Sequence, residues 1–154
     1  MGYAPGSGSK QAFKRWDAHR FARLAERLGG EAWIFLGPDE PELLPAFEGR
    51  GFKVVRGLPL EETVAAIGGM DLMVGNDNGL MHIAYGLEKK TVTIYGMTNE
   101  KETGGYGPQN RAVSLALSCR PCFDSATDRI GCTTLECLRD LTVEEVEWIC
   151  RESL

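Results

Sequence analysis

A short polar run between two apolar segments has the residue types of an anion-binding site. The run lies in VGNDNGLMHIA (residues 74–84), and the pattern predicts that a helix begins near Asn78. The first N–H groups of a helix are unpaired and carry the positive end of its dipole, and Gly79 would let a ligand approach them closely. At 100° per residue, Asn78 and His82 should point together, away from the sheet. These features favour a phosphate; alternatively, Asp77 or Asn78 only caps the helix and His82 is a surface residue.

A second loop, PGSGSKQAFKRW, combines small residues with cations and follows the short strand expected at the start of the chain. Small residues would expose backbone donors at Ser7 and Ser9, and three side chains could neutralise a diphosphate: Lys10, Lys14 and Arg15. The loop is not a P-loop, because the Gly-Lys-Ser/Thr ending is missing. A solvated basic turn is the alternative interpretation.

Four cysteines lie close together in CRPCFDSATDRIGCTTLEC, with two residues between the first pair and four between the second. These spacings fit a structural zinc site with four thiolates: Cys119, Cys122, Cys132 and Cys137. Unliganded thiols, or a disulfide formed in the purified protein, are the alternatives. Cys150 lies on the apolar side of the last expected helix, which favours an ordinary buried thiol.

The remaining chain alternates short apolar strands with helices. Asp17 should cap a helix whose start is held by packing of Trp16 on Phe21. Further strands are expected at 32–37, 52–55, 70–75 and 91–96, and further helices at 40–47, 60–67, from 78 onwards and at 142–152, the last with a capping box. This alternation predicts an α/β fold: a Rossmann-like open parallel sheet with helices on both faces. Ligands of such sheets bind outside the carboxyl ends of the strands, where both polar loops should lie.

Composition limits the classes of function. The 154 residues suffice for one domain, residues 1–154, with a proper core. The net charge of −5 argues against nucleic acid as a partner. No apolar run approaches the roughly 18 residues of a membrane span, and no signal-peptide pattern is present. We therefore expect a cytoplasmic location.

Several motifs, in order along the chain, resemble glycosyltransferase family 9, the ADP-heptose:lipopolysaccharide heptosyltransferases. The PGSGSKQAFKRW loop resembles the family's Pro-Gly-Ser…Lys-x-Trp opening, and GNDNGLMHIAYGL resembles its Gly-Asn-Asp-Ser/Thr-Gly-x-x-His stretch. VTIYGMTNEKETGGYGP and the CRPCF…C…CL tail are also similar to family segments. The resemblance implies the C-terminal half of a GT-B fold, which binds the nucleotide-sugar donor.

The resemblance also implies roles for individual residues. Ser7, Ser9 and Lys14 would contact the diphosphate or the sugar, and Glu40 would contact the ribose. Four residues would hold the sugar and the phosphates: Asp77, Asn78, Gly79 and His82. Lys14 and His82 would act in catalysis by stabilising the leaving diphosphate. Asn78 stands where the family usually has Ser or Thr.

In this family the acceptor site and the proposed general base belong to an N-terminal domain, for which the sequence shows no counterpart. We therefore expect a donor-binding half that is inactive in sugar transfer on its own and approaches the inner membrane only through its parent protein. The chemistry would need no cofactor, because fixed donors stabilise the diphosphate. Two alternatives remain: another GT-B enzyme, such as a UDP-sugar epimerase or transferase, and a stand-alone nucleotide- or zinc-binding module without catalysis.

Overall fold

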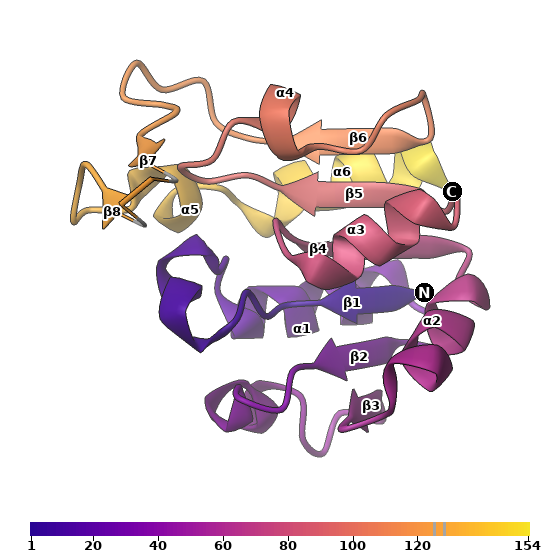
Figure 1. Cartoon of the computed structure of the whole chain (residues 1–154). Coiled ribbons are helices and arrows are strands. Elements are labelled where there is room, and N and C mark those ends of the chain that lie inside the picture. The colour runs from indigo at the N-terminus through magenta and orange to yellow at the C-terminus, as the bar shows by residue number, and fades with distance from the viewer. Residues whose placement is uncertain (125, 128) are drawn as a thin grey trace.

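A six-stranded parallel sheet forms the centre of the computed structural model (Figure 1), which describes residues 1–124, 126–127 and 129–154. Its strand order is β3-β2-β1-β4-β5-β6, and every neighbouring pair is parallel. The strands are β1 (Gly2–Ala4), β2 (Trp33–Leu36), β3 (Lys53–Arg56), β4 (Leu72–Asn76), β5 (Lys90–Ile94) and β6 (Asn110–Val113).

Helices cover both faces of this sheet. On one face α1 (Ala18–Leu28) and α6 (Val143–Ser153) pack side by side, and on the other lie α2 (Leu60–Gly68) and α3 (Gly79–Gly86). Each face buries its own hydrophobic cluster, the larger one under α1 and α6. This arrangement confirms the predicted Rossmann-like fold.

The strand order reverses between β1 and β4, the two central strands. From β1 the chain moves outward to β2 and β3, and it then crosses back to β4 and continues outward to β5 and β6. Loops that leave two strands at such a switch point diverge to opposite sides and open a crevice at the carboxyl edge. The two loops singled out in the sequence are the ones that leave β1 and β4.

The predicted helix starts are confirmed in detail. The Asp17 side chain accepts a hydrogen bond from the N–H of Arg20. The rings of Trp16 and Phe21 meet edge to face with centroids 5.1 Å apart. Thr142 and Glu145 form the expected capping box at the start of α6.

Other elements differ in detail from the expectation. The helix expected at 40–47 is present as a 3-10 helix, η2 (Pro41–Ala46), with Pro45 inside it. The loop after β1 contains a 3-10 segment, η1 (Ser9–Lys14). The edge strand β6 went unpredicted because only Val113 of its four residues is buried. The remaining short elements are α4 (Glu100–Thr103), α5 (Glu136–Arg139) and the antiparallel pair β7 (Phe123–Asp124) and β8 (Arg129–Ile130).

Within the described ranges, no helix has the length and apolarity that crossing a bilayer requires.

Asn76, the last residue of β4, ties down both ends of the loop that follows β1. Its side-chain oxygen accepts from the Trp16 N–H at 2.9 Å, and its amide donates to the Pro5 carbonyl at 2.7 Å. Asn76 is fully buried, so both groups depend on this one side chain.

We expect Asn76→Ala to destabilise the chain, because two buried backbone groups lose their partner at about 1–3 kcal/mol each. Urea unfolding at neutral pH measures the loss. Asn99→Ala is the matched control: it removes an exposed cap of α4 and should cost about 1 kcal/mol or less. Equal losses in the two variants would contradict the role assigned to Asn76.

Candidate functional site

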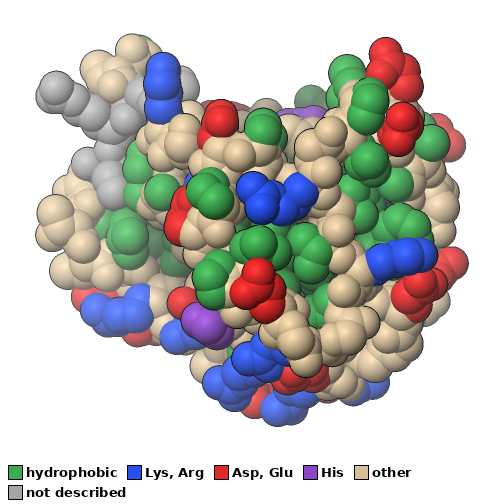
Figure 2. All heavy atoms as spheres, turned by 90° about the horizontal axis from the view of Figure 1, so that it is seen from below, with side chains coloured by type: hydrophobic (Ala, Val, Ile, Leu, Met, Phe, Trp, Pro, Cys, Tyr) green, Lys and Arg blue, Asp and Glu red, His purple; other side chains and the backbone are tan. Residues whose placement is uncertain are grey.

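An open cleft of about 890 Å³ lies at the carboxyl edge of the sheet, at the switch point. Its walls come from the loops that leave β1, β2, β3 and β4, together with the first turns of α3. Seen from the β3 side, the molecule is hollowed between two raised parts with hydrophobic and basic side chains on the walls (Figure 2). The volume lies within the usual range of about 300–1,000 Å³ for small-molecule sites.

Glu40 connects two of these loops. One carboxylate oxygen accepts from the backbone N–H groups of Ser7 and Gly8, at 2.7 and 2.8 Å, and the other accepts from Gly37 at 3.0 Å. The Arg15 guanidinium pairs with the same carboxylate at 3.1 Å, and Glu40 is only 4% exposed. Its carboxylate therefore holds the loops after β1 and β2 against each other, and the ribose contact predicted for it stays a prediction.

Gly6 and Ser7 also contribute to holding the loop after β1 against Glu40. A Cβ at Gly6 would overlap the Glu40 carboxylate, so only glycine permits this approach. The Ser7 hydroxyl donates to the Gln11 carbonyl at 2.7 Å and accepts from Arg15. Ser7 lines the cleft, whereas Ser9 is exposed and lies outside its lining.

Asn78 caps α3, and its side chain also anchors the loop after β1. Its oxygen accepts from the N–H groups of Leu80 and Met81, and its amide donates to the carbonyls of Ala4 and Gly6. These four bonds use the full hydrogen-bonding capacity of the amide. The side chain therefore positions the loop, and a ligand contact from Asn78 would have to come from its backbone.

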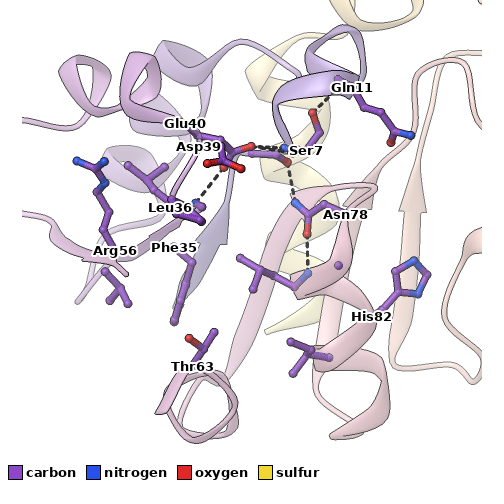
Figure 3. A pocket seen from close by; sticks show the side chains of 18 of the residues that line it. Ser7, Gln11, Phe35, Leu36, Asp39, Glu40, Arg56, Thr63, Asn78 and His82 are labelled. Carbon is purple, nitrogen blue, oxygen red and sulfur yellow. Dashed lines mark hydrogen bonds between the residues drawn. The ribbon is translucent and has the colours of Figure 1, made fainter. Parts of the chain in front are cut away.

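The expectation that Asn78 and His82 point together was wrong. Asn78 is the N-cap, with φ −151° and ψ 173°, so the helical 100° spacing begins only at Gly79. The Asn78 amide lies toward the loop of Ser7, and the His82 ring extends away from it (Figure 3). Gly79 lines the cleft and has open space around the position of a Cβ, as the predicted close approach of a ligand requires.

Lys14, Asp77 and His82 meet beside the first turn of α3. The Asp77 carboxylate, 7% exposed, lies 3.7 Å from Lys14 Nζ and 4.0 Å from His82 Nε2. Lys14 is 11% exposed, and its ammonium also lies over the ring of Phe123. His82 is 54% exposed and open to the cleft. Two potential donors to an anion thus flank a buried carboxylate at the positive end of the α3 dipole.

The His82 ring packs against Tyr85, whose hydroxyl belongs to a hydrogen-bond network. The His82 ring contacts the Tyr85 ring edge to face, with centroids 5.4 Å apart. The Tyr85 hydroxyl bonds to Thr93 at 2.7 Å and to Tyr95 at 3.1 Å. Burial raises the pKa of both tyrosines, with a smaller upward effect from the charge of Asp77. Both therefore remain neutral hydrogen-bonding groups at physiological pH.

Sequence reasoning missed the opposite end of the cleft. There Phe35 and Val55 form an apolar wall at the ends of β2 and β3, and Thr63 and Arg56 complete it. Arg56 lies at the far side of the cleft from His82 (Figure 3). Phe35, Val55 and Arg56 stand at strand ends on the same carboxyl edge, so the rule that found the two loops would have found them as well, whereas Thr63 comes from α2.

The short elements beside the four cysteines, β7, β8 and α5, lie at the same edge (Figure 1), and none of these cysteines lines the cleft. Cys119 is exposed, Cys122 and Cys132 are half-buried, Cys137 is buried, and all four are free thiols. Burial and the nearby Cys132 raise the pKa of Cys137. Over the described residues, no group of three His, Cys, Asp or Glu side chains is arranged to hold a metal ion. The zinc site stays a prediction from the spacing.

The fold and the cleft have counterparts among known proteins. The family model described as Glycosyltransferase family 9 (heptosyltransferase) matches residues 2–132. Lipooligosaccharide heptosyltransferase 2 of Campylobacter jejuni is 32% identical over 158 residues, which cover 95% of this chain and 48% of the relative.

Solved structures of two proteins show the same fold as this chain. A glycosyl transferase family 9 structure from Veillonella parvula is 28% identical with a TM-score of 0.77, over 99% of this chain and 45% of that one. An Escherichia coli heptosyltransferase solved with ADP shares the fold at 22% identity and a TM-score of 0.77, over 100% of this chain and 44% of that one. The chain thus spans about half the length of the curated relative and of both structures.

We expect Glu40→Gln to lower the free energy of unfolding by about 1–3 kcal/mol, because it removes a buried charge from Arg15 and an acceptor from the loop N–H groups. Urea unfolding measures the change. Glu42→Gln is the matched control, since Glu42 also pairs with Arg15 but is 54% exposed; an exposed pair contributes at most about 1 kcal/mol. A loss from Glu42→Gln as large as that from Glu40→Gln would refute the anchoring role.

Proposed function

The chain belongs to glycosyltransferase family 9, and on that premise we propose that it is the C-terminal, donor-binding half of a heptosyltransferase with ADP-heptose as its ligand. The observation that carries this proposal is the meeting of Lys14, Asp77 and His82 with the first turn of α3 at the switch point. Opposite this polar end lies an apolar wall of the right kind for a nucleobase.

The two ends of the cleft suggest how the donor lies. Lys14 and the positive end of α3 at Gly79 would bind the diphosphate, because both present positive charge to the same space. The Asp77 carboxylate would repel phosphate and therefore suits sugar hydroxyls, which can donate to it. The nucleoside would extend toward Phe35 and Val55. The ADP of the Escherichia coli heptosyltransferase supports a nucleoside diphosphate as the ligand class.

The proposed reaction is a single inverting displacement. An acceptor hydroxyl, deprotonated by a base from the acceptor domain, attacks the anomeric carbon while the bond to the diphosphate breaks. Lys14, His82 and the positive end of the α3 dipole stabilise the negative charge that develops on the leaving diphosphate. We propose no metal for this step, since these fixed donors act on the charge directly.

The acceptor site and the base belong to the N-terminal domain that we propose as the partner of this half. The half alone would bind donor without transferring its sugar. We expect the parent protein to act in the cytoplasm and to contact the inner membrane where its lipopolysaccharide acceptor lies.

Isothermal titration calorimetry tests donor binding. We expect the chain to bind ADP and to bind UDP and GDP much more weakly. Lys14→Met should weaken ADP binding by about 10–100-fold, because it removes one charge-assisted hydrogen bond of about 1.5–3 kcal/mol.

Lys10→Met provides the control, since Lys10 lies on the same η1 segment but is exposed and outside the lining of the cleft. It should leave ADP affinity within about twofold of the original, well below the tenfold that 1.4 kcal/mol represents. Tighter binding of UDP than of ADP would instead favour a UDP-sugar enzyme. Binding of none of the three nucleotides would contradict the proposed function.

We also propose a structural zinc ion for the four-cysteine segment, on the strength of its spacing. Cys137 would supply a buried thiolate, and Cys119, Cys122 and Cys132 would complete the set. We expect elemental analysis of the purified chain to find zinc in about equimolar amount, lost on denaturation with a chelator. Four titratable thiols in a folded, zinc-free chain would refute this proposal.

A further inference from the structure

Lys14 is held between two groups that come from distant parts of the chain. On one side the Asp77 carboxylate lies 3.7 Å from its Nζ. On the other side the face of the Phe123 ring covers the ammonium, with Nζ 4.4 Å from the ring centroid. Phe123 belongs to the cysteine-rich segment, directly after Cys122. A part of the chain outside the lining of the cleft therefore reaches one of the cations inside it.

The backbone around Phe123 is anchored to the sheet. Its N–H donates to the Met97 carbonyl at 3.1 Å, in the loop that leaves β5. Close by, Arg120 is 8% exposed and donates to the carbonyls of Gly96 and Thr98 in the same loop. The ring is thus presented from the carboxyl edge of the sheet by a fixed support.

The ring contacts the η1 segment at a second point. The rings of Phe13 and Phe123 lie 6.0 Å apart at a tilt of 38°. Phe123 therefore contacts the side chains of two consecutive residues of η1: the ring of Phe13 and the ammonium of Lys14. Both the position of the turn and the direction of the lysine side chain then depend on this ring.

We propose that Phe123 is a positioning residue for Lys14, so that one residue of the cysteine-rich segment is a functional part of the donor site; this inference rests on the proposed function. A ring face attracts an ammonium but takes no proton from it and satisfies none of its hydrogen-bonding capacity. The lysine therefore keeps its charge and its donors for the ligand while it loses rotamer freedom before the ligand arrives. Asp77 alone would hold the ammonium by direct pairing.

A purely structural role is the competing explanation, because Phe123 also packs against the larger hydrophobic cluster. The two explanations differ in what they predict for Lys14. If the ring only fills space, its loss affects the chain regardless of the residue at position 14. If the ring positions the ammonium, its loss affects ADP binding only when the ammonium is present.

Calorimetry with ADP on a double-mutant cycle distinguishes them. Phe123→Leu should weaken ADP binding by about 3–10-fold, the range that a partly buried cation–π contact supplies. Phe123→Tyr keeps a ring face and should bind within about twofold of the original. In a Lys14→Met background, Phe123→Leu should cause no further loss.

Trp33→Leu is the matched control. The Trp33 ring covers the Lys53 ammonium at 3.9 Å, away from the lining of the cleft. This variant removes a comparable cation–π contact, so ADP affinity should not change. An equal loss in Phe123→Leu and Trp33→Leu would show that the effect is general destabilisation.

A second readout follows the contact without any ligand. Ring currents should shift the NMR signals of the Lys14 side-chain methylene beside the ammonium upfield, and Phe123→Leu should return them to ordinary lysine values. The same signals of Lys10, which is exposed, should be ordinary in both proteins.

The outcomes separate the two proposals. If the unmodified chain binds no ADP, the proposed function fails and the positioning role fails with it. If the chain binds ADP and Phe123→Leu binds it equally well, or loses affinity equally with Met at position 14, only the positioning role is overturned. Unshifted Lys14 signals in the unmodified chain would overturn it as well.

Discussion

The structure depends on how the backbone of the loop after β1 is satisfied. This loop leaves the centre of the sheet in a Gly- and Ser-rich stretch that forms no ladder of its own, yet its two ends, at Pro5–Gly6 and at Trp16, are buried. Buried N–H and C=O groups must find partners. Three side chains supply them: Asn76 and Asn78 bond to backbone groups of residues 4–6 and 16, and Glu40 accepts from Ser7 and Gly8. All three come from segments that start at neighbouring strand ends.

This requirement divides the site residues into two groups. Glu40, Asn78 and the Ser7 hydroxyl are engaged within the protein and give the cleft its shape. Lys14, Gly79 and His82 line the cleft, where they can contact a ligand. A loop held by polar side chains can then present a lysine beside the positive end of α3 with little reorganisation, which is what stabilisation of a leaving anion demands.

Local chemistry made much of the fold predictable. Asp17 capping α1, the Trp16–Phe21 contact and the Thr142–Glu145 box each involve residues within five positions of one another. The features that the sequence did not predict involve residues that are far apart along the chain. The direction of the Asn78 amide depends on carbonyls in the β1 loop, and the ring over Lys14 comes from Phe123. Sequence spacing carries no information on such contacts, although motifs at strand ends did locate the cleft itself.

The central claim is that the cleft between the β1 loop and α3 binds the donor. Amide chemical-shift mapping of the chain with ADP-heptose tests it most directly, since it locates a ligand rather than only detecting one. We expect the largest changes at Gly8, Gly79 and Leu80, accompanied by a change in the ring signals of His82. Changes confined to the opposite, amino-terminal edge of the sheet, or none at saturating donor, would contradict the account.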